Sequence, residues 1–324
     1  MNNNIVSNEK VSTNIHQTLF NLPTREKVSE HVAISEFGEL DILVIKHPKF
    51  KAAIAKQGSH LISWQPNETE PVFWVSERSP FKLGKAIRGG IPVCWPWFGP
   101  LGSPSHGFAR NTIWNLENID DTNEYVELTL TLCETAETLK IWPHNFLLSM
   151  TFRLSDECNI SMTSKGEFSF TTALHSYFNL SDIHNVRVKN VGGNYIDALR
   201  EKQSFDDNEN SETHFKTHID RIFTNPSDTI SLHDCGFKRK ITLSNNHVTY
   251  QNACDKLFTK QPCNIVIWNP GAELSLTMDD MGDDGYLTMG CVESAVIKNH
   301  ITLKHPNQHE LFMKISCESN NSHK

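Results

Sequence analysis

The chain has 324 residues, of which 38% are hydrophobic, and its formal net charge at pH 7 is −8. This acidic balance gives no reason to expect a nucleic-acid backbone or an anionic membrane surface as the main partner. No apolar run approaches the ~18 residues that a membrane-spanning helix needs. The composition therefore predicts a globular protein that acts on small molecules and binds neither nucleic acid nor membrane.

Both ends of the chain are rich in Asn, Ser and charged residues. We expect residues 1–20 and 318–324 to be flexible tails, with a single domain over residues 21–317 between them. The first ten residues, MNNNIVSNEK, lack the basic and apolar regions of a secretory signal. None of the eight cysteines forms a C-x-x-C pair. A cytoplasmic location is the expectation that follows.

Apolar and polar residues alternate along much of the chain, in short runs bounded by Gly, Pro, Asn or Asp. In chain order these runs are 126–133, 146–154, 159–163, 186–191, 240–243, 265–268, 273–278 and 289–296. A period of two is typical of half-buried antiparallel strands. Helical signals are few: residues 134–139 allow one or two turns, and residues 199–218 form a charged, strand-poor surface excursion. The pattern predicts the all-β class, as a large antiparallel sandwich or barrel.

Residues 85–99, KAIRGGIPVCWPWFG, do not follow the alternating pattern. Two glycines follow Arg88 and allow the backbone to approach another group closely. Pro92 and Pro96 argue against a central strand. An arginine beside a rigid aromatic loop suits the wall of a small-molecule pocket. An arginine paired with a carboxylate beneath a hydrophobic loop explains the same pattern equally well.

Two histidine-containing segments are also unlike ordinary strands. In SHGFAR, residues 105–110, His106 and Arg110 are placed to face one anionic or hydroxyl-rich ligand. In ALHSYFNL, residues 173–180, His175 lies in a strand-like run. A histidine in such a run is more often a core residue with its hydrogen bonds satisfied than a catalyst.

The run from Met289 to Ile297 contains one charged residue, Glu293. Alternation places Glu293 on the same face of the strand as Cys291. An unpaired carboxylate in the interior costs several kcal/mol. Glu293 therefore needs a partner, a ligand or a bound proton, and a structural ion pair remains an open alternative.

Two weaker patterns are interpreted as solvated loops. His214 and His218 have the i, i+4 spacing of zinc ligands, but the acidic residue of a zinc-protease motif is absent. Residues 279–285 resemble a calcium loop, except that Gly290 stands where the bidentate Glu is required. No metal site is predicted.

Seven stretches, taken in order, resemble the hexose-6-phosphate mutarotase branch of the aldose 1-epimerase (galactose mutarotase-like) superfamily. They are QGSHLISW (57–64), KAIRGGIPVCWPWFG (85–99), HGFARN (106–111), ALHSYFNL (173–180), DRIF (220–223), WNPG (268–271) and DDGYLTMGCVESA (283–295). The specific part is RGGIP with W-P-W-F-G, followed by HGFAR. The resemblance implies a β-sandwich of the supersandwich type, which agrees with the strand pattern.

The same resemblance implies an isomerase that interconverts the α and β anomers of a hexose 6-phosphate, most directly glucose 6-phosphate. His175 is then the acid and Glu293 the base of ring opening and reclosure, with no cofactor. A nearby carboxylate is expected to keep His175 protonated near neutral pH. The implied partner is a small phosphosugar, and we expect a monomer or a weak dimer.

The resemblance also implies that Arg88, His106 and Asp220 bind substrate. Arg88 and Arg110, with Lys85, are the candidates for the phosphate, since guanidinium groups form strong bidentate hydrogen bonds with it. The remaining substrate-binding candidate is Gln57.

Three questions stay open at this point. The substrate could be an unphosphorylated hexose such as galactose. The protein could instead bind carbohydrate without catalysis. The aromatics Trp95, Trp97 and Phe98 could line the sugar site or pack in the core.

Overall fold

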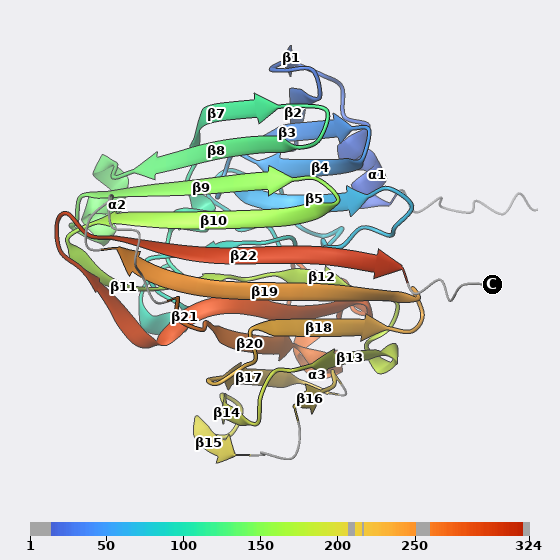
Figure 1. Ribbon diagram of the computed structural model, residues 1–324, viewed down its shortest axis with the longest axis vertical. Helices are drawn as coiled ribbons and strands as arrows, with labels where there is room; N and C mark the ends of the chain where they lie inside the picture. The colour runs from blue at the N-terminus through green and yellow to red at the C-terminus, as the bar shows by residue number, and fades with distance from the viewer. Residues whose placement is uncertain (1–13, 207–210, 216, 251–259, 320–324) are drawn as a thin grey trace, which may run out of the picture.

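The computed structural model describes residues 14–206, 211–215, 217–250 and 260–319, and strands dominate these ranges (Figure 1). The alternating runs of the sequence form strands because each strand buries one row of side chains. Along β9 (Phe146–Leu154), for example, Phe146, Leu148 and Met150 are buried and the residues between them are half-buried. The all-β class expected from the sequence is confirmed.

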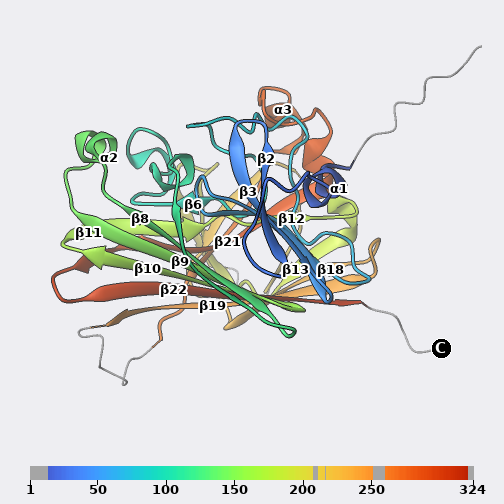
Figure 2. The same cartoon turned by 90° about the horizontal axis from the view of Figure 1, so that it is seen from above.

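Two large sheets form the main layers of the molecule (Figures 1 and 2). The nine-stranded sheet has the order β16 (Glu212–Thr213), β13 (Val186–Lys189), β18 (Thr229–Asp234), β19 (Arg239–Tyr250), β22 (Gln308–Ser319), β10 (Glu157–Gly166), β9, β8 (Val126–Cys133), β7 (Asn115–Asp121). The eight-stranded sheet has the order β15 (Gln203–Asp206), β14 (Asn194–Asp197), β17 (Ile219–Phe223), β20 (Asn264–Asn269), β21 (Met289–Leu303), β11 (Phe168–Leu174), β6 (Val93–Cys94), with β12 (Tyr177–Asn179) also paired to β21. Their facing side chains, among them Leu148, Phe170 and Ile267, share one hydrophobic core.

A smaller five-stranded sheet lies toward the N-terminal end of the chain. Its order is β1 (Glu26–Lys27), β2 (Val32–Phe37), β3 (Leu40–His47), β4 (Phe50–Ala55), β5 (His60–Pro66). A bridge between Leu61 of β5 and Ile91 joins this sheet to the glycine-rich segment 85–99. The five-stranded sheet therefore fixes where that segment lies beside the eight-stranded sheet.

The predicted N-terminal tail extends further along the chain than the structure allows. Residues 15–20 form helix α1 (Ile15–Phe20), with Asn14 as its N-cap. Leu19 and Phe20 are buried in a hydrophobic cluster with side chains of β3 and β4. The prediction of a tail over 1–20 is corrected for residues 15–20, because their apolar side chains cover an otherwise exposed sheet face. At the other end, β22 continues to Ser319.

Short helices occupy the connections. They are α2 (Ala136–Ile141), α3 (Gly271–Ser275) and the 3-10 turns η1 (Gly99–Leu101), η2 (Ala109–Asn111), η3 (Ile183–Asn185), η4 (Gly285–Thr288). The turns expected near 134–139 are confirmed by α2. In the part of the chain that is described, no helix has the length and apolarity to cross a bilayer.

One predicted strand, 273–278, is wrong, because the chain forms α3 up to Ser275 and no strand over residues 276–278. The side chain of Asn269 accepts a hydrogen bond from the Gly271 N–H at 2.8 Å, and Gly271 has a φ of +65°. This turn ends β20 and starts the helix. Leu276, one of the apolar residues of that run, is 68% exposed.

Candidate active site

A cavity of about 580 Å³ opens on the face of the eight-stranded sheet that points away from the main core. Strand alternation decides which side chains reach it. On β21, Glu293 and Ile297 line the cavity, while Val292 and Val296 enter the core between the large sheets. On β17, the lining residue Asp220 follows the same rule.

Backbone pairing places His175 across from Glu293. Leu174, the last residue of β11, pairs with Ser294 of β21, and Tyr177, the first residue of β12, pairs with Cys291. His175 lies in the short link between these two pairings. Its N–H donates to the carbonyl of Pro92 at 3.0 Å, so the 85–99 segment also fixes its position.

The side chains of His175 and Glu293 meet in the floor of the cavity. The distance from His175 Nε2 to Glu293 Oε1 is 3.4 Å, longer than a good hydrogen bond but short enough for a charge interaction. Glu293 is 1% exposed and His175 is 7% exposed. Glu293 Oε2 and His175 Nδ1 have no hydrogen-bond partner within the described ranges. Both groups thus keep bonding capacity for a ligand.

Burial pushes both groups toward their neutral forms. Desolvation lowers the pKa of His175 well below its usual value, and His106, Arg110 and Arg88 lower it further. Desolvation also raises the pKa of Glu293 well above its usual value, and the Asp220 carboxylate adds to this shift. Burial and the nearby charges therefore oppose the protonation of His175 that was expected from its nearness to Glu293.

His106 faces the cavity with a defined tautomer. Its Nδ1 accepts a hydrogen bond from the Gly99 N–H at 3.3 Å, and Cys94 Sγ lies 3.3 Å from the same nitrogen. An Nδ1 that accepts from a backbone N–H carries no proton, so the proton is on Nε2. Burial, with a smaller effect of Arg110 and Arg88, lowers the pKa of His106 to about 3. His106 is thus a neutral donor, with its ring centroid 5.5 Å from that of His175.

Arg88 lies on the cavity wall and is held from two sides. Its guanidinium donates to Asp280 Oδ2 at 3.1 Å from Nε and to the Tyr177 hydroxyl at 3.0 Å. The Tyr177 ring in turn stacks on His175, with centroids 4.8 Å apart and planes 11° from parallel. Arg88, Tyr177 and His175 therefore form one rigid unit.

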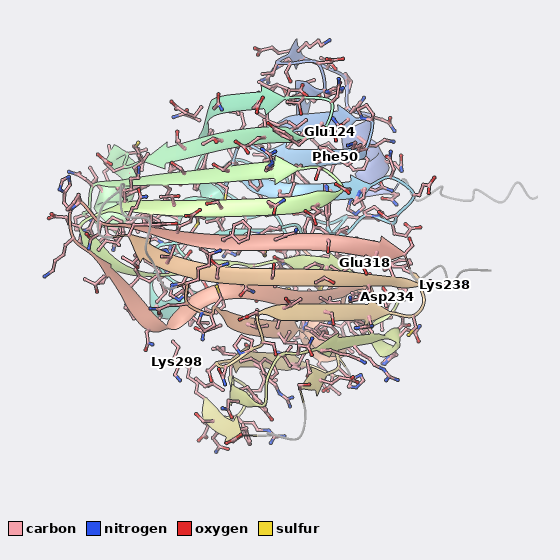
Figure 3. All side chains as sticks on the ribbon, in the orientation of Figure 1. Phe50, Glu124, Asp234, Lys238, Lys298 and Glu318 are labelled. Atoms are coloured by element: carbon pink, nitrogen blue, oxygen red, sulfur yellow. The ribbon has the colours of Figure 1, made fainter. Side chains whose placement is uncertain are left out.

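The far side of the cavity carries an acid and two lysines. Burial raises the pKa of Asp220, with Asp197 adding to the shift and His218 opposing it. Lys202 and Lys298 line the same cavity at its exposed rim. Figure 3 shows Lys298 at the outer edge of the molecule. The cationic groups at the rim are therefore these lysines.

Three of the predicted substrate-binding residues do not line the cavity. The Gln57 amide donates to the Lys85 carbonyl at 2.8 Å and accepts from the Gly84 N–H, so it holds the loop over residues 82–85. The Lys85 side chain is exposed and lies outside the cavity lining. Arg110 donates to the Ser105 carbonyl at 2.8 Å and acts on His106 and His175 only through its charge. The structure thus places these three residues outside the cavity lining, and their direct contact with substrate stays a prediction.

Of the three aromatic residues Trp95, Trp97 and Phe98, two pack in the core and one lines the cavity. Trp95 is fully buried in the main core, and Trp97 packs against that core. Phe98 lines the cavity, where Trp268 of β20 provides a second aromatic surface. Apolar ring faces of this kind suit the carbon face of a sugar.

The sequence interpretation missed five cavity or support residues: Tyr177, Asp280, Trp268, Lys202 and Lys298. Tyr177 and Trp268 belong to stretches that were already singled out, and their side chains line the cavity from β12 and β20. Asp280 lay in a loop interpreted as solvated, and only the fold brings it to Arg88. Lys202 belongs to the 199–218 segment interpreted as a surface excursion, which the structure shows to contain β15 and β16.

Comparison with known proteins agrees with this architecture. The model of the family described as aldose 1-epimerase matches residues 41–316. The chain is 42% identical to a protein of Escherichia coli (strain K12) named "Putative glucose-6-phosphate 1-epimerase", over 86% of this chain and 90% of that protein. A protein of the same name from Salmonella typhimurium (strain LT2) is 40% identical, over 85% of this chain and 90% of its own length.

A solved structure gives the same result for the fold. The Salmonella typhimurium crystal structure described as a "putative mutarotase" superposes with a TM-score of 0.87, at 36% identity, and covers 94% of this chain and 100% of that one. The galactose mutarotase-like fold expected from the sequence is confirmed, and the chain belongs to the aldose 1-epimerase family.

Proposed function

We propose that this enzyme interconverts the α and β anomers of a hexose 6-phosphate, with glucose 6-phosphate as the first substrate to test. Family membership supports the reaction, and the name of the similar E. coli protein supports the phosphosugar. The observation that carries the proposal is the buried pair of Glu293 and His175, 3.4 Å apart in a sugar-sized cavity. A module that only binds sugar needs no such pair.

Anomer exchange requires two proton transfers at the anomeric centre. The hydroxyl on C1 loses its proton, the C1–O5 bond breaks, and O5 gains a proton. After the aldehyde turns about C1–C2, the same transfers in reverse close the ring on the other face. We assign Glu293 to O1 and His175 to O5, and each positioned group contributes typically ~10²–10⁴-fold to the rate.

The protonation state of the pair suits this sequence. Between the lowered pKa of His175 and the raised pKa of Glu293, the two groups together hold one exchangeable proton. Burial favours that proton on Glu293 before the reaction. Transfer to His175 produces the carboxylate that accepts from O1 and the imidazolium that donates to O5. Each turnover returns the pair to its starting state, because ring closure reverses both transfers.

Three further residues are placed to hold the sugar. Neutral His106 offers an Nε2–H donor beside His175. Asp220 offers acceptors from β17 on the other side of the cavity. Arg88, fixed by Asp280 and Tyr177, offers guanidinium donors. Hydroxyl groups of a pyranose need both kinds of partner, and the rings of Phe98 and Trp268 contact carbon instead.

Lys202 and Lys298 are our candidates for the phosphate. Both line the exposed rim, where a dianionic group keeps part of its hydration. Arg88 already has a carboxylate partner in Asp280, and Arg110 and Lys85 do not line the cavity. From floor to rim, the proposed cavity therefore carries the acid–base pair, then polar and aromatic side chains that hold the sugar, and then two lysines that bind the phosphate.

The rim assignment is tested by NMR exchange spectroscopy on glucose 6-phosphate and on glucose. In the double variant Lys202→Gln, Lys298→Gln, we expect KM for glucose 6-phosphate to rise ~10-fold or more, because charge-assisted hydrogen bonds are lost. The exchange of glucose is expected to stay unchanged. Lys85→Gln is the matched control. An equal loss for both sugars would place the phosphate elsewhere, and wild-type exchange no faster than in buffer would end the enzymatic proposal.

We also propose a cytoplasmic location and a monomeric or weakly dimeric state. The seven cysteines within the described ranges are unpaired thiols, and a reducing compartment maintains thiols in this form. Cell fractionation and analytical ultracentrifugation test these two proposals directly.

A further inference from the structure

Cys291 is a fully buried group next to the floor of the cavity; it is not among the lining residues, and the proposed reaction does not use it. It lies on β21 two residues before Glu293, and so on the same face, and its Cα pairs with Tyr177 on one side and Trp268 on the other. One ligand-type atom from each of His175, Cys291 and Glu293 lies within 4.8 Å of the other two. All three residues are buried. An imidazole, a thiol and a carboxyl group thus lie in one buried cluster.

The spacing of these atoms is close to that of a zinc site. Zinc bonds of ~2.0–2.3 Å in a tetrahedral arrangement keep neighbouring ligand atoms roughly 3.3–3.8 Å apart. His175 Nε2 and Glu293 Oε1 already lie 3.4 Å apart. The thiol needs to approach by about 1.5 Å at most, the difference between 4.8 Å and the shortest of these ligand spacings. The buried Glu293 Oε2, without a partner in the described residues, is a second sign that this floor is built to receive a ligand.

The charges of these groups also suit a divalent cation. A thiolate and a carboxylate together cancel the charge of Zn²⁺, and the imidazole binds in its neutral form. A neutral complex avoids the large cost of leaving net charge in a desolvated site. The open cavity supplies the fourth position for water.

We propose that the cavity floor binds Zn²⁺ through His175 Nε2, Cys291 Sγ and the Glu293 carboxylate. Binding releases two protons, one from the Cys291 thiol and one from the proton shared by His175 and Glu293. The bound ion occupies both groups of the acid–base pair. Zinc is therefore a competitive inhibitor, a consequence that rests on the proposed function, whereas the binding itself does not.

Direct metal titration tests the binding without any sugar. With Co²⁺ in place of Zn²⁺, the wild-type enzyme is expected to show a thiolate-to-cobalt charge-transfer band in the near ultraviolet at one equivalent. Calorimetry with Zn²⁺ in buffers of different ionisation enthalpy is expected to report release of about two protons, as the ligand set requires. Cys291→Ser should abolish the cobalt band and weaken Zn²⁺ binding at least ~100-fold, since a thiolate ligand is lost.

Cys263→Ser is the matched control, because Cys263 is equally buried but belongs to no such group of ligands among the described residues. It should keep both the cobalt band and the zinc affinity. If Cys291→Ser fails to fold, Cys291→Ala is measured in its place. A wild-type enzyme without the charge-transfer band, or a Cys291 variant that binds zinc like wild type, would overturn the proposal. Anomer exchange measured in metal-free buffer reports the proposed function separately.

Discussion

At the residue scale, Glu293 is the group on which the account depends. A carboxyl group that is 1% exposed, with an oxygen left unpartnered in the described ranges, is costly unless a proton or a ligand compensates for it. The sequence located this anomaly as the one charge in an apolar run. Its neighbour His175 comes from a different strand, so only the pairing of β11 and β12 with β21 could show that the two meet.

His106 gives a prediction at the same scale. Because its Nδ1 accepts from the Gly99 N–H, the neutral ring should be the Nε2–H tautomer. Its pKa of about 3 means that it stays neutral through pH 5, where an ordinary histidine is charged. Long-range ¹H–¹⁵N correlation spectra of the ring, recorded between pH 8 and pH 5 and assigned with His106→Gln, check both statements. If the ring of His106 becomes protonated near pH 6.5, the prediction that it is a neutral donor is contradicted.

At the element scale, the glycine pair after Arg88 shows how a turn sets the site. Gly90 has a φ of +60°, and a Cβ there would lie 2.4 Å from the Leu61 carbonyl oxygen and 2.8 Å from His60 Nε2. Neither atom can move away easily, since the segment is bridged to β5 at Leu61 and Ile91. The close approach places Arg88 on the cavity wall.

Gly90→Ala is therefore expected to lower the free energy of unfolding by about 2–4 kcal/mol, from backbone strain together with the steric clash. Chemical denaturation followed by fluorescence measures this change. Gly282→Ala is the matched control, because a Cβ at Gly282 meets no atom within 4 Å. Equal stabilities of the two variants would show that the segment adapts to a side chain.

The sequence predicted the strands well wherever polar and apolar residues alternate. The run 126–133 coincides with β8, and 146–154 coincides with β9. It failed at 273–278, because the turn formed by Asn269 and Gly271 decides that segment and alternation does not detect such a turn. For the site, it singled out residues within distinctive stretches, and it did not show that the Gln57 amide bonds the loop over 82–85. Which side chains share a cavity depends on contacts between distant strands, which a linear pattern does not contain.

At the scale of the whole molecule, several buried histidines are kept neutral by the fold. Burial lowers the pKa of His16 and His60 to about 4 and that of His309 to about 3. The unfolded chain protonates these rings near pH 6.5, so unfolding takes up protons at lower pH. Stability is then greatest above pH 6.5 and falls as the pH drops toward 4. At pH 5 each such ring costs about 2 kcal/mol.

Urea denaturation between pH 7 and pH 4.5 measures this loss. His60→Gln is the informative variant, because an amide can still donate to the Gly89 carbonyl, which His60 Nε2 contacts at 2.7 Å. It should remove about one proton from the uptake on unfolding and so reduce the pH dependence. His184→Gln, on an exposed turn, is the control. A wild-type stability that is flat over this range would contradict the prediction.

The central claim is that Glu293 and His175 transfer protons to and from one sugar in one cavity. Its most direct test is the anomer exchange rate of glucose 6-phosphate, measured by NMR for wild type, Glu293→Gln and His175→Ala. Each substitution should lower the rate by ~10²–10⁴-fold, whereas Glu273→Gln on the exposed surface of α3 should leave it unchanged. A Glu293→Gln enzyme that exchanges the anomers as fast as wild type would contradict the account.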